Sequence, residues 1–306
     1  MTTSIQAIKI SDKKAEEFRG YMLEWYDKHK RTIPWRAMDG QKPDPYHVWL
    51  SEIMCQQTTV QAVVPYFLKF IDKWPRVHDL ATAEREEVMK AWAGLGYYAR
   101  ARNLHKCAQI ISGDYGGRFP ENKADLLKLP GIGDYTSSAI AAMAFNKAET
   151  VVDGNVERIM ARYLAIQTPL PKGKPDLKRA ASLLFEGAHE RPGDFAQSLM
   201  DLGATICTPR SPKCMICPIA EGCKAREQGI QDTLPAKEPQ KPKPQKFGYV
   251  YWLHNDQGEY LLQTRPDTEM LGGMIALPTS EWLPKTQKQA LSHPGFVGND
   301  FNKSKI

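Results

Sequence analysis

The chain has 306 residues, of which 42% are hydrophobic and 25% charged, a balance typical of soluble globular proteins with room for two domains. This composition excludes collagen-like and largely disordered classes. The formal net charge of +6 favours a polyanionic partner only mildly, because the four lysines and one glutamate of residues 235–246 contribute half of it. The apolar stretch 139–145 is far shorter than the roughly 20 residues of a membrane span. Since the first fifteen residues carry no secretory signal, we expect a cytoplasmic protein with reduced thiols.

Two segments near the start have apolar residues at helical spacing, residues 11–30 and residues 46–64. Glu52 falls at the edge of the apolar stripe of the second helix. Desolvation favours the neutral form of a carboxyl in such a place, which suits a general acid. The same position also suits a glutamate that reaches from a helix border to solvent. Pro65 is expected to kink or restart this helix.

Residues 76–93 are predicted to form two short helices, followed by a flexible turn and the sequence Tyr97-Tyr98-Ala99-Arg100-Ala101-Arg102. Aromatic rings can wedge into a base stack while guanidinium groups meet phosphates, so the combination suits DNA. A tyrosine pair that closes the edge of a core beside solvated arginines is the alternative. Further helices are predicted over residues 103–115 and 121–129.

A glycine turn, Leu129-Pro130-Gly131-Ile132-Gly133, precedes a helix predicted over 136–146. Two glycines so placed allow backbone N–H groups to point outward at a helix start, and such a nest binds phosphate. An ordinary turn between helices is the alternative. Asp153 then precedes a helix over 155–166, where it is either a functional acid or a simple N-cap. Residues 176–204 supply two more helices.

Four cysteines, Cys207, Cys214, Cys217 and Cys223, have the spacing C-x6-C-x2-C-x5-C within seventeen residues. Thiolates this close together enclose either a zinc ion or an iron–sulfur cluster. The three prolines among them indicate a rigid loop. Cys55 and Cys107 lie in predicted helices and are most simply buried small hydrophobes.

The pattern changes near the C-terminus. Lysine and proline alternate through residues 235–246, which predicts an extended linker. Residues 247–263, with Asn255-Asp256-Gln257-Gly258 between two apolar runs, have the signature of a β-hairpin. After Trp282 the strand pattern fades, and the roughly 40–60 residues after the linker are few for an independent sheet domain.

Several of these segments together resemble the endonuclease III superfamily of helix-hairpin-helix DNA glycosylases, and within it the adenine-excising branch. The resemblance covers about residues 17–282 and is carried by residues 49–58, 94–103, 129–136, 152–158 and 207–223. It implies a mainly α, two-lobed fold with a 4Fe–4S loop and a partial α+β Nudix-like C-terminal domain. The expected domains are a helical catalytic domain over 1–234, a linker over 235–246 and a truncated Nudix-like domain over 247–306.

The resemblance also assigns roles to individual residues. Glu52 matches the acid that protonates adenine, and Asp153 matches the aspartate beneath the sugar. Tyr135 stands where lyase-active relatives carry the lysine that forms a Schiff base. The four cysteines match the ligands of a 4Fe–4S cluster, so iron is preferred over zinc. Asn155 completes the catalytic set, and the expected DNA-binding residues are Arg36, Gln56, Gln57, Thr58, Tyr98, Leu129, Gly131 and Gly133.

These matches imply a monofunctional DNA repair N-glycosylase that removes adenine mispaired with 8-oxoguanine or guanine and leaves an abasic site. Its expected partner is double-stranded DNA with an adenine mispair, and we expect a monomer in the nucleoid-containing cytoplasm. The alternatives are a bifunctional oxidised-pyrimidine glycosylase/AP lyase and a non-catalytic iron–sulfur DNA-binding protein.

Two departures from the branch pattern stand out. Cys55 replaces the usual leucine beside the pocket. The Nudix-like domain looks unfinished, with Ser292 and His293 only faintly resembling the lesion-contacting loop, and weakened discrimination of 8-oxoguanine from guanine is expected from this truncation.

Overall fold

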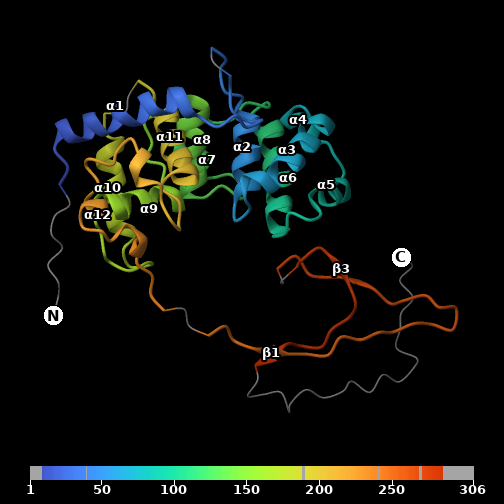
Figure 1. The fold of residues 1–306 in the computed structure, drawn as a ribbon. Coiled ribbons are helices and arrows are strands. Elements are labelled where there is room, and N and C mark those ends of the chain that lie inside the picture. The colour runs from blue at the N-terminus through green and yellow to red at the C-terminus, as the bar shows by residue number, and fades with distance from the viewer. Residues whose placement is uncertain (1–8, 39, 188–189, 240–241, 269–270, 285–306) are drawn as a thin grey trace. The chain divides into compact units, whose positions relative to one another are not determined.

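The computed structural model describes residues 9–38, 40–187, 190–239, 242–268 and 271–284. The chain forms two compact units, residues 1–238 and residues 239–306. The first unit is helical (Figure 1). Its α-helices are α1 (Asp12–His29), α2 (Pro45–Cys55), α3 (Val60–Lys73), α4 (Val77–Ala81), α5 (Arg85–Trp92), α6 (Ala99–Asp114), α7 (Lys123–Leu126), α8 (Asp134–Phe145), α9 (Gly154–Tyr163), α10 (Lys174–Phe185), α11 (Pro192–Thr205) and α12 (Lys224–Glu227), and its 3-10 helices are η1 (Cys214–Ile216) and η2 (Gln231–Thr233).

Helix α8 lies between the two hydrophobic cores of this unit. Its sequence is apolar or small on every side, and its residues 136–142 are all buried. Ile140 and Ala141 belong to the core built mainly by α2–α6, whereas Ala139 and Ala142 belong to the core built mainly by α1 and α9–α11. Figure 1 shows these two groups of helices as the two lobes of the unit. The start of α8 is therefore fixed at the junction of the lobes.

The predicted helix over residues 46–64 is in fact two helices, so that prediction was wrong in its continuity. Helix α2 ends at Cys55, and Gln57 has a positive φ of 59°. The Thr59 side chain accepts a hydrogen bond from the backbone N–H of Ala62 and starts α3 anew. Pro65 lies inside α3. The apolar stripe runs in phase across the break, which explains why hydrophobic spacing alone suggested one helix.

Arg100 does not point to solvent, as the expected phosphate contact would require. Helix α6 begins at Ala99, four residues before its predicted start, and the Arg100 side chain is buried beneath two loops. Its guanidinium lies over the rings of Trp92 and Tyr97, at 5.2 and 5.5 Å from their centroids. It donates hydrogen bonds to the carbonyls of Ile53, Met54, Gln56, Leu95 and Gly96 and to the Thr58 hydroxyl. Arg100 thus ties the loop after α2 to the loop before α6.

The second unit contains short strands. Strand β1 (Lys246–Phe247) pairs antiparallel with β4 (Leu283–Pro284), and β2 (Gln263–Thr264) pairs antiparallel with β3 (Ile275–Ala276). In place of the full hairpin predicted over 247–263, the described residues show a turn and one isolated bridge between His254 and Tyr260. The side chain of Asn255 holds this turn by accepting from the N–H groups of Gln257 and Glu259.

The Nudix-like assignment remains a prediction, and Ser292 and His293 lie outside the described residues. Among the helices that the structure describes, none combines the length and the hydropathy that crossing a membrane requires.

Candidate active site

Glu52 is a buried carboxyl in the middle of α2. The helix buries most of its circumference, so the packing of its apolar neighbours carries Glu52 out of water. Burial raises the pKa of Glu52, a hydrogen bond from the Tyr135 hydroxyl lowers it, and the negative charge of Asp153 raises it, so that together they place this pKa at about 7. A carboxyl with this pKa keeps its proton in a large fraction of molecules at neutral pH, as a general acid must.

Tyr135 lies in the first turn of α8 and serves Glu52 as a neutral donor. Burial, together with the nearby carboxylates of Glu52 and Asp153, raises the pKa of Tyr135 well above its ordinary value. The phenol therefore stays protonated and holds the carboxyl of Glu52 in place.

Asp153 is the N-cap of α9, so the capping interpretation of this residue is correct. Its Oδ1 accepts hydrogen bonds from the backbone N–H groups of Asn155 and Val156, at 2.9 and 2.8 Å. Its Oδ2 accepts from Nδ2 of Asn155 at 2.7 Å. The capping role does not exclude a chemical one, because the same three donors fix an anionic carboxylate in one orientation.

A single cavity of about 1370 Å³ brings these residues together. The structure thus joins the two acids that are far apart in the sequence, Glu52 from α2 and Asp153 from the start of α9. Among the predicted site residues, this cavity is lined by Glu52, Asp153, Tyr135, Asn155, Arg36, Gln56, Gln57 and Thr58.

The glycine turn is the hairpin of a helix-hairpin-helix formed with α7 and α8. Gly131 has a positive φ of 79°, and a Cβ there would lie 3.0 Å from that of Asn103, so glycine is required. Gly133 is the N-cap of α8 in extended backbone. The side chain of Leu129 is buried in the first core, so this residue can offer only its backbone to a ligand. The amide of Gln56 donates to the Thr136 hydroxyl at 3.3 Å and connects the turn to α2.

The two tyrosines before α6 differ in exposure. Tyr97 is 61% exposed and has a positive φ of 49°, whereas Tyr98 packs against the first core. The resemblance selected Tyr98 as the DNA-contacting ring, and the dipeptide itself does not show which of the two rings faces outward. The start of α6 at Ala99 would have been the useful signal, since it makes Tyr98 the helix N-cap. The DNA-wedging role of Tyr98 stays a prediction.

Arg31 and Gln197 also line the cavity, and sequence reasoning did not single them out. Neither lies in a motif. An isolated arginine or glutamine gives no sign of the pocket that it faces.

The four predicted ligand cysteines surround a second cavity between α9 and the loop around η1. All four are free thiols, as a cluster cage requires. On α9, the Arg162 guanidinium donates to Sγ of Cys207 at 3.3 Å. Within the described residues, no group of three or more His, Cys, Asp or Glu side chains is placed to hold one metal ion. Four cysteine sulfurs are the ligand set that an iron–sulfur cluster takes, so the lining of this cavity fits such a cluster.

The cage also touches the catalytic side of α9. Arg158 donates to the carbonyl of Cys207 at 2.7 Å and to Oδ1 of Asn155 at 2.8 Å. Asn155 in turn donates to Asp153. A continuous set of hydrogen bonds therefore runs from a cluster ligand to the carboxylate.

Known proteins are similar to this chain over most of its length. Residues 50–183 match the profile described as HhH-GPD superfamily base excision DNA repair protein, and residues 207–223 match the iron–sulfur binding domain of endonuclease III. The adenine DNA glycosylase of Buchnera aphidicola subsp. Acyrthosiphon pisum is 37% identical over 80% of this chain, which covers 69% of that protein. The chain belongs to the adenine DNA glycosylase family.

Other members of the adenine DNA glycosylase family are longer. The human protein is 36% identical over 89% of this chain, and the protein of Arabidopsis thaliana is 37% identical over 88%. The chain covers 59% and 48% of their lengths, so it spans about half of these curated relatives.

Solved structures agree with the family assignment. A thermostable thymine-DNA glycosylase has a TM-score of 0.62 at 32% identity, with 71% of this chain and 98% of that chain covered. Endonuclease III in a non-covalent DNA complex has a TM-score of 0.58 at 20% identity, with coverages of 73% and 100%, and shows the shared fold. The mainly α helix-hairpin-helix fold is therefore confirmed. The iron–sulfur match begins at Cys207 and ends at Cys223, which confirms the 4Fe–4S prediction.

The buried carboxyl should make stability depend on pH. The folded-state pKa of Glu52 lies above its ordinary value of 4.5, at about 7. The folded state therefore binds more protons between these values, and stability falls as pH rises from about 4.5 to about 7. Glu52→Gln removes this loss, so we expect the variant to exceed the wild type in free energy of unfolding by about 3 kcal/mol near pH 8.5 and by little near pH 5.

Urea unfolding at the two pH values measures this difference. Glu86→Gln, at an exposed glutamate of α5, is the control and should behave as the wild type does. A Glu52→Gln variant no more stable than the wild type near pH 8.5 would contradict the raised pKa.

Proposed function

We propose that the chain is a monofunctional DNA N-glycosylase that removes adenine mispaired with 8-oxoguanine or guanine. One observation carries the proposal: a cavity holds a buried carboxyl with a pKa of about 7 and a carboxylate fixed by three N–H donors. The family supports double-stranded DNA with an adenine mispair as the partner. We also propose that the protein acts as a monomer in the nucleoid-containing cytoplasm.

The chemistry requires two carboxyls in opposite states. Breaking a deoxyribosyl–adenine bond makes an oxocarbenium-like sugar, and adenine leaves easily only when its ring nitrogen is protonated. Glu52 supplies that proton. The bond between the sugar carbon and the base nitrogen then breaks, and its electron pair leaves with adenine. Asp153 stabilises the positive sugar, to which water adds with loss of a proton, giving the abasic site.

The environment separates the roles of the two acids. Glu52 is buried by the apolar packing of α2, which favours its neutral form. Asp153 is held in one orientation by two backbone N–H donors and the side-chain amide of Asn155. The nearby negative charge of Asp153 also helps Glu52 to keep its proton.

Tyr135 supports a reaction without strand cleavage. A lyase needs an amine that forms a Schiff base with the sugar, and the phenol of Tyr135 cannot form one. Its hydrogen bond to Glu52 gives the residue a different role, which is to hold the acid.

The iron–sulfur cluster would be held by the four cysteines beside α9. It supplies no step of this reaction, and its rigid loop anchors Arg158 and Arg162, both of which bond to atoms of Cys207.

The proposal is tested by incubating the protein with a duplex that carries adenine opposite 8-oxoguanine and measuring free adenine. We expect release of adenine without strand cleavage until alkali is added. Glu52→Gln should slow release by about 10²–10⁴-fold, because it removes the general acid. Asp153→Asn should abolish release while the affinity for the mispaired duplex survives.

Each alternative has its own result in this assay. Strand cleavage before alkali, with release of an oxidised pyrimidine, would identify the bifunctional lyase. Binding of the duplex without release of any base would identify a non-catalytic protein.

We further propose that Tyr97 is the ring that enters the base stack when adenine is extruded. It is exposed, and its guanidinium neighbour Arg100 is fixed by six hydrogen bonds. Tyr97→Ala should slow adenine release by about tenfold or more, because a stacked ring contributes about 1–3 kcal/mol. Tyr98→Ala should mainly lower the melting temperature, because its ring packs against the core.

Fluorescence of 2-aminopurine beside the mispair reports the unstacking directly, at a temperature where both variants are folded. Loss of the signal in Tyr98→Ala but not in Tyr97→Ala would assign the wedge to Tyr98 instead.

A further inference from the structure

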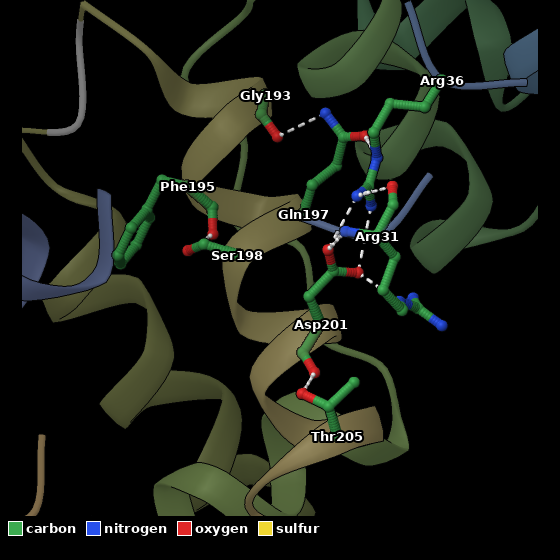
Figure 2. Close-up of polar contacts among 8 residues, drawn as sticks. All are labelled: Arg31, Arg36, Gly193, Phe195, Gln197, Ser198, Asp201 and Thr205. Atoms are coloured by element: carbon green, nitrogen blue, oxygen red, sulfur yellow. Dashed lines mark hydrogen bonds and ion pairs between the residues drawn. The ribbon is translucent and has the colours of Figure 1, made fainter. Parts of the chain in front are cut away.

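A fully buried carboxylate lies behind the wall of the active-site cavity. Asp201 of α11 has a side-chain exposure of 0% and faces the segment between α1 and α2 (Figure 2). Its Oδ1 accepts from Nε of Arg31 at 2.6 Å and from Nη2 of Arg36 at 3.0 Å. Its Oδ2 accepts from the backbone N–H of Arg31 at 2.9 Å and from Nη1 of Arg36 at 2.7 Å. Each carboxylate oxygen therefore accepts two hydrogen bonds, one from Arg31 and one from Arg36.

Burying these charges destabilises the fold unless Asp201 and both arginines are present. A buried charge is tolerated when it is paired and hydrogen-bonded, and removing one partner leaves the others uncompensated. Here one carboxylate faces two guanidinium groups, so loss of its charge would leave two close positive charges with nothing between them. Asp201 is thus the residue on which the position of both arginines depends.

Both arginines that Asp201 holds in place line the active-site cavity. Arg31 lines the cavity, and its side chain is 26% exposed. Only its Nε is bonded to Asp201, and Figure 2 shows the terminal nitrogens of Arg31 pointing away from that carboxylate. Within the described residues, these two terminal nitrogens have no hydrogen-bond partner. Arg31 therefore presents free donors on the same cavity as Glu52 and Asp153.

Arg36 in turn fixes the side chain of Gln197. Its Nη1 also donates to the carbonyl of Arg31 at 2.8 Å, and its Nε donates to Oε1 of Gln197 at 2.9 Å. Because a guanidinium only donates, it fixes the Gln197 amide with the oxygen toward Arg36. The Gln197 nitrogen then bonds the carbonyl of Gly193 at 3.3 Å (Figure 2). Three cavity-lining side chains are in this way set by one residue outside the lining.

We propose that Asp201 is a positioning residue of the glycosylase, which holds Arg31, Arg36 and Gln197 against the extruded nucleotide. The proposal rests on the function proposed above. Asp201 therefore affects the rate of base release. Affinity for the duplex depends instead on the surfaces that bind the phosphates. Asp201 does not touch the reacting atoms.

The first test is Asp201→Asn, which keeps the size of the side chain and removes its charge. The new amide donor faces the donors of the arginines, so they must move. A displacement of about 1 Å in a catalytic pocket costs about 100-fold in rate. We expect the single-turnover rate of adenine release to fall by about this factor, with affinity for the mispaired duplex nearly unchanged.

Ser198→Ala is the matched control. Ser198 is equally buried on the same helix, but its hydroxyl donates to the carbonyl of Phe195 and lies away from the arginines (Figure 2). This variant should release adenine at the wild-type rate. Equal losses in both variants would show a general effect of the helix and would overturn the proposal.

A second comparison remains decisive if Asp201→Asn folds poorly. In an Arg31→Met, Arg36→Met background, the carboxylate has lost its partners, so adding Asp201→Asn should raise the melting temperature and cause no further loss of rate. A lower melting temperature, or a further 100-fold loss, would show that Asp201 acts independently of the arginines. If the wild type itself releases no adenine, the proposed function fails. If the wild type releases adenine and Asp201→Asn alone releases it at the wild-type rate, only the positioning role fails.

Discussion

The proposed reaction depends on keeping one carboxyl neutral beside another that is ionised. Glu52 lies in a helix that buries most of its surface, and this burial raises its pKa to about 7. Asp153 is only half-buried, and three N–H donors hold its carboxylate in one orientation. The hydrogen bond from Tyr135 lowers the pKa of Glu52 and holds its carboxyl in place, while the charge of Asp153 raises that pKa.

The fold places the two carboxyls in one cavity by bringing the starts of α8 and α9 close to α2. Helix α8 is buried on all sides between the two cores, so its first turn, which carries Tyr135, has a fixed place against α2. The start of α9 carries Asp153, and its next turns carry the arginines that bond Cys207. The loop that carries the four cysteines therefore stabilises the helix that begins at Asp153. Behind the lining of the cavity, α11 supplies Asp201, which accepts hydrogen bonds from Arg31 and Arg36 of the segment before α2.

The residues with the most specific chemistry could be predicted from the sequence. The spacing of the four cysteines needs no fold to be recognised, and the glycine turn and Asp153 occur in motifs. Residues whose role arises from long-range packing could not be predicted. Arg100 looked like a phosphate ligand because its burial depends on two loops that meet only in the folded chain. The break after Cys55 was missed because the apolar stripe continues in phase beyond it. Asp201 belongs to no motif, and its partners are about 165 positions away in the sequence.

The pH dependence of the single-turnover rate of adenine release tests the central claim most directly. If a protonated Glu52 delivers the proton, the rate is constant below the pKa of about 7 and falls about tenfold for each further pH unit above it. The slow residual rate of Glu52→Gln should show no such step. A wild-type rate that stays level or rises from about pH 6 to about pH 9, or a variant that keeps the same step, would contradict the assignment of Glu52 as the acid.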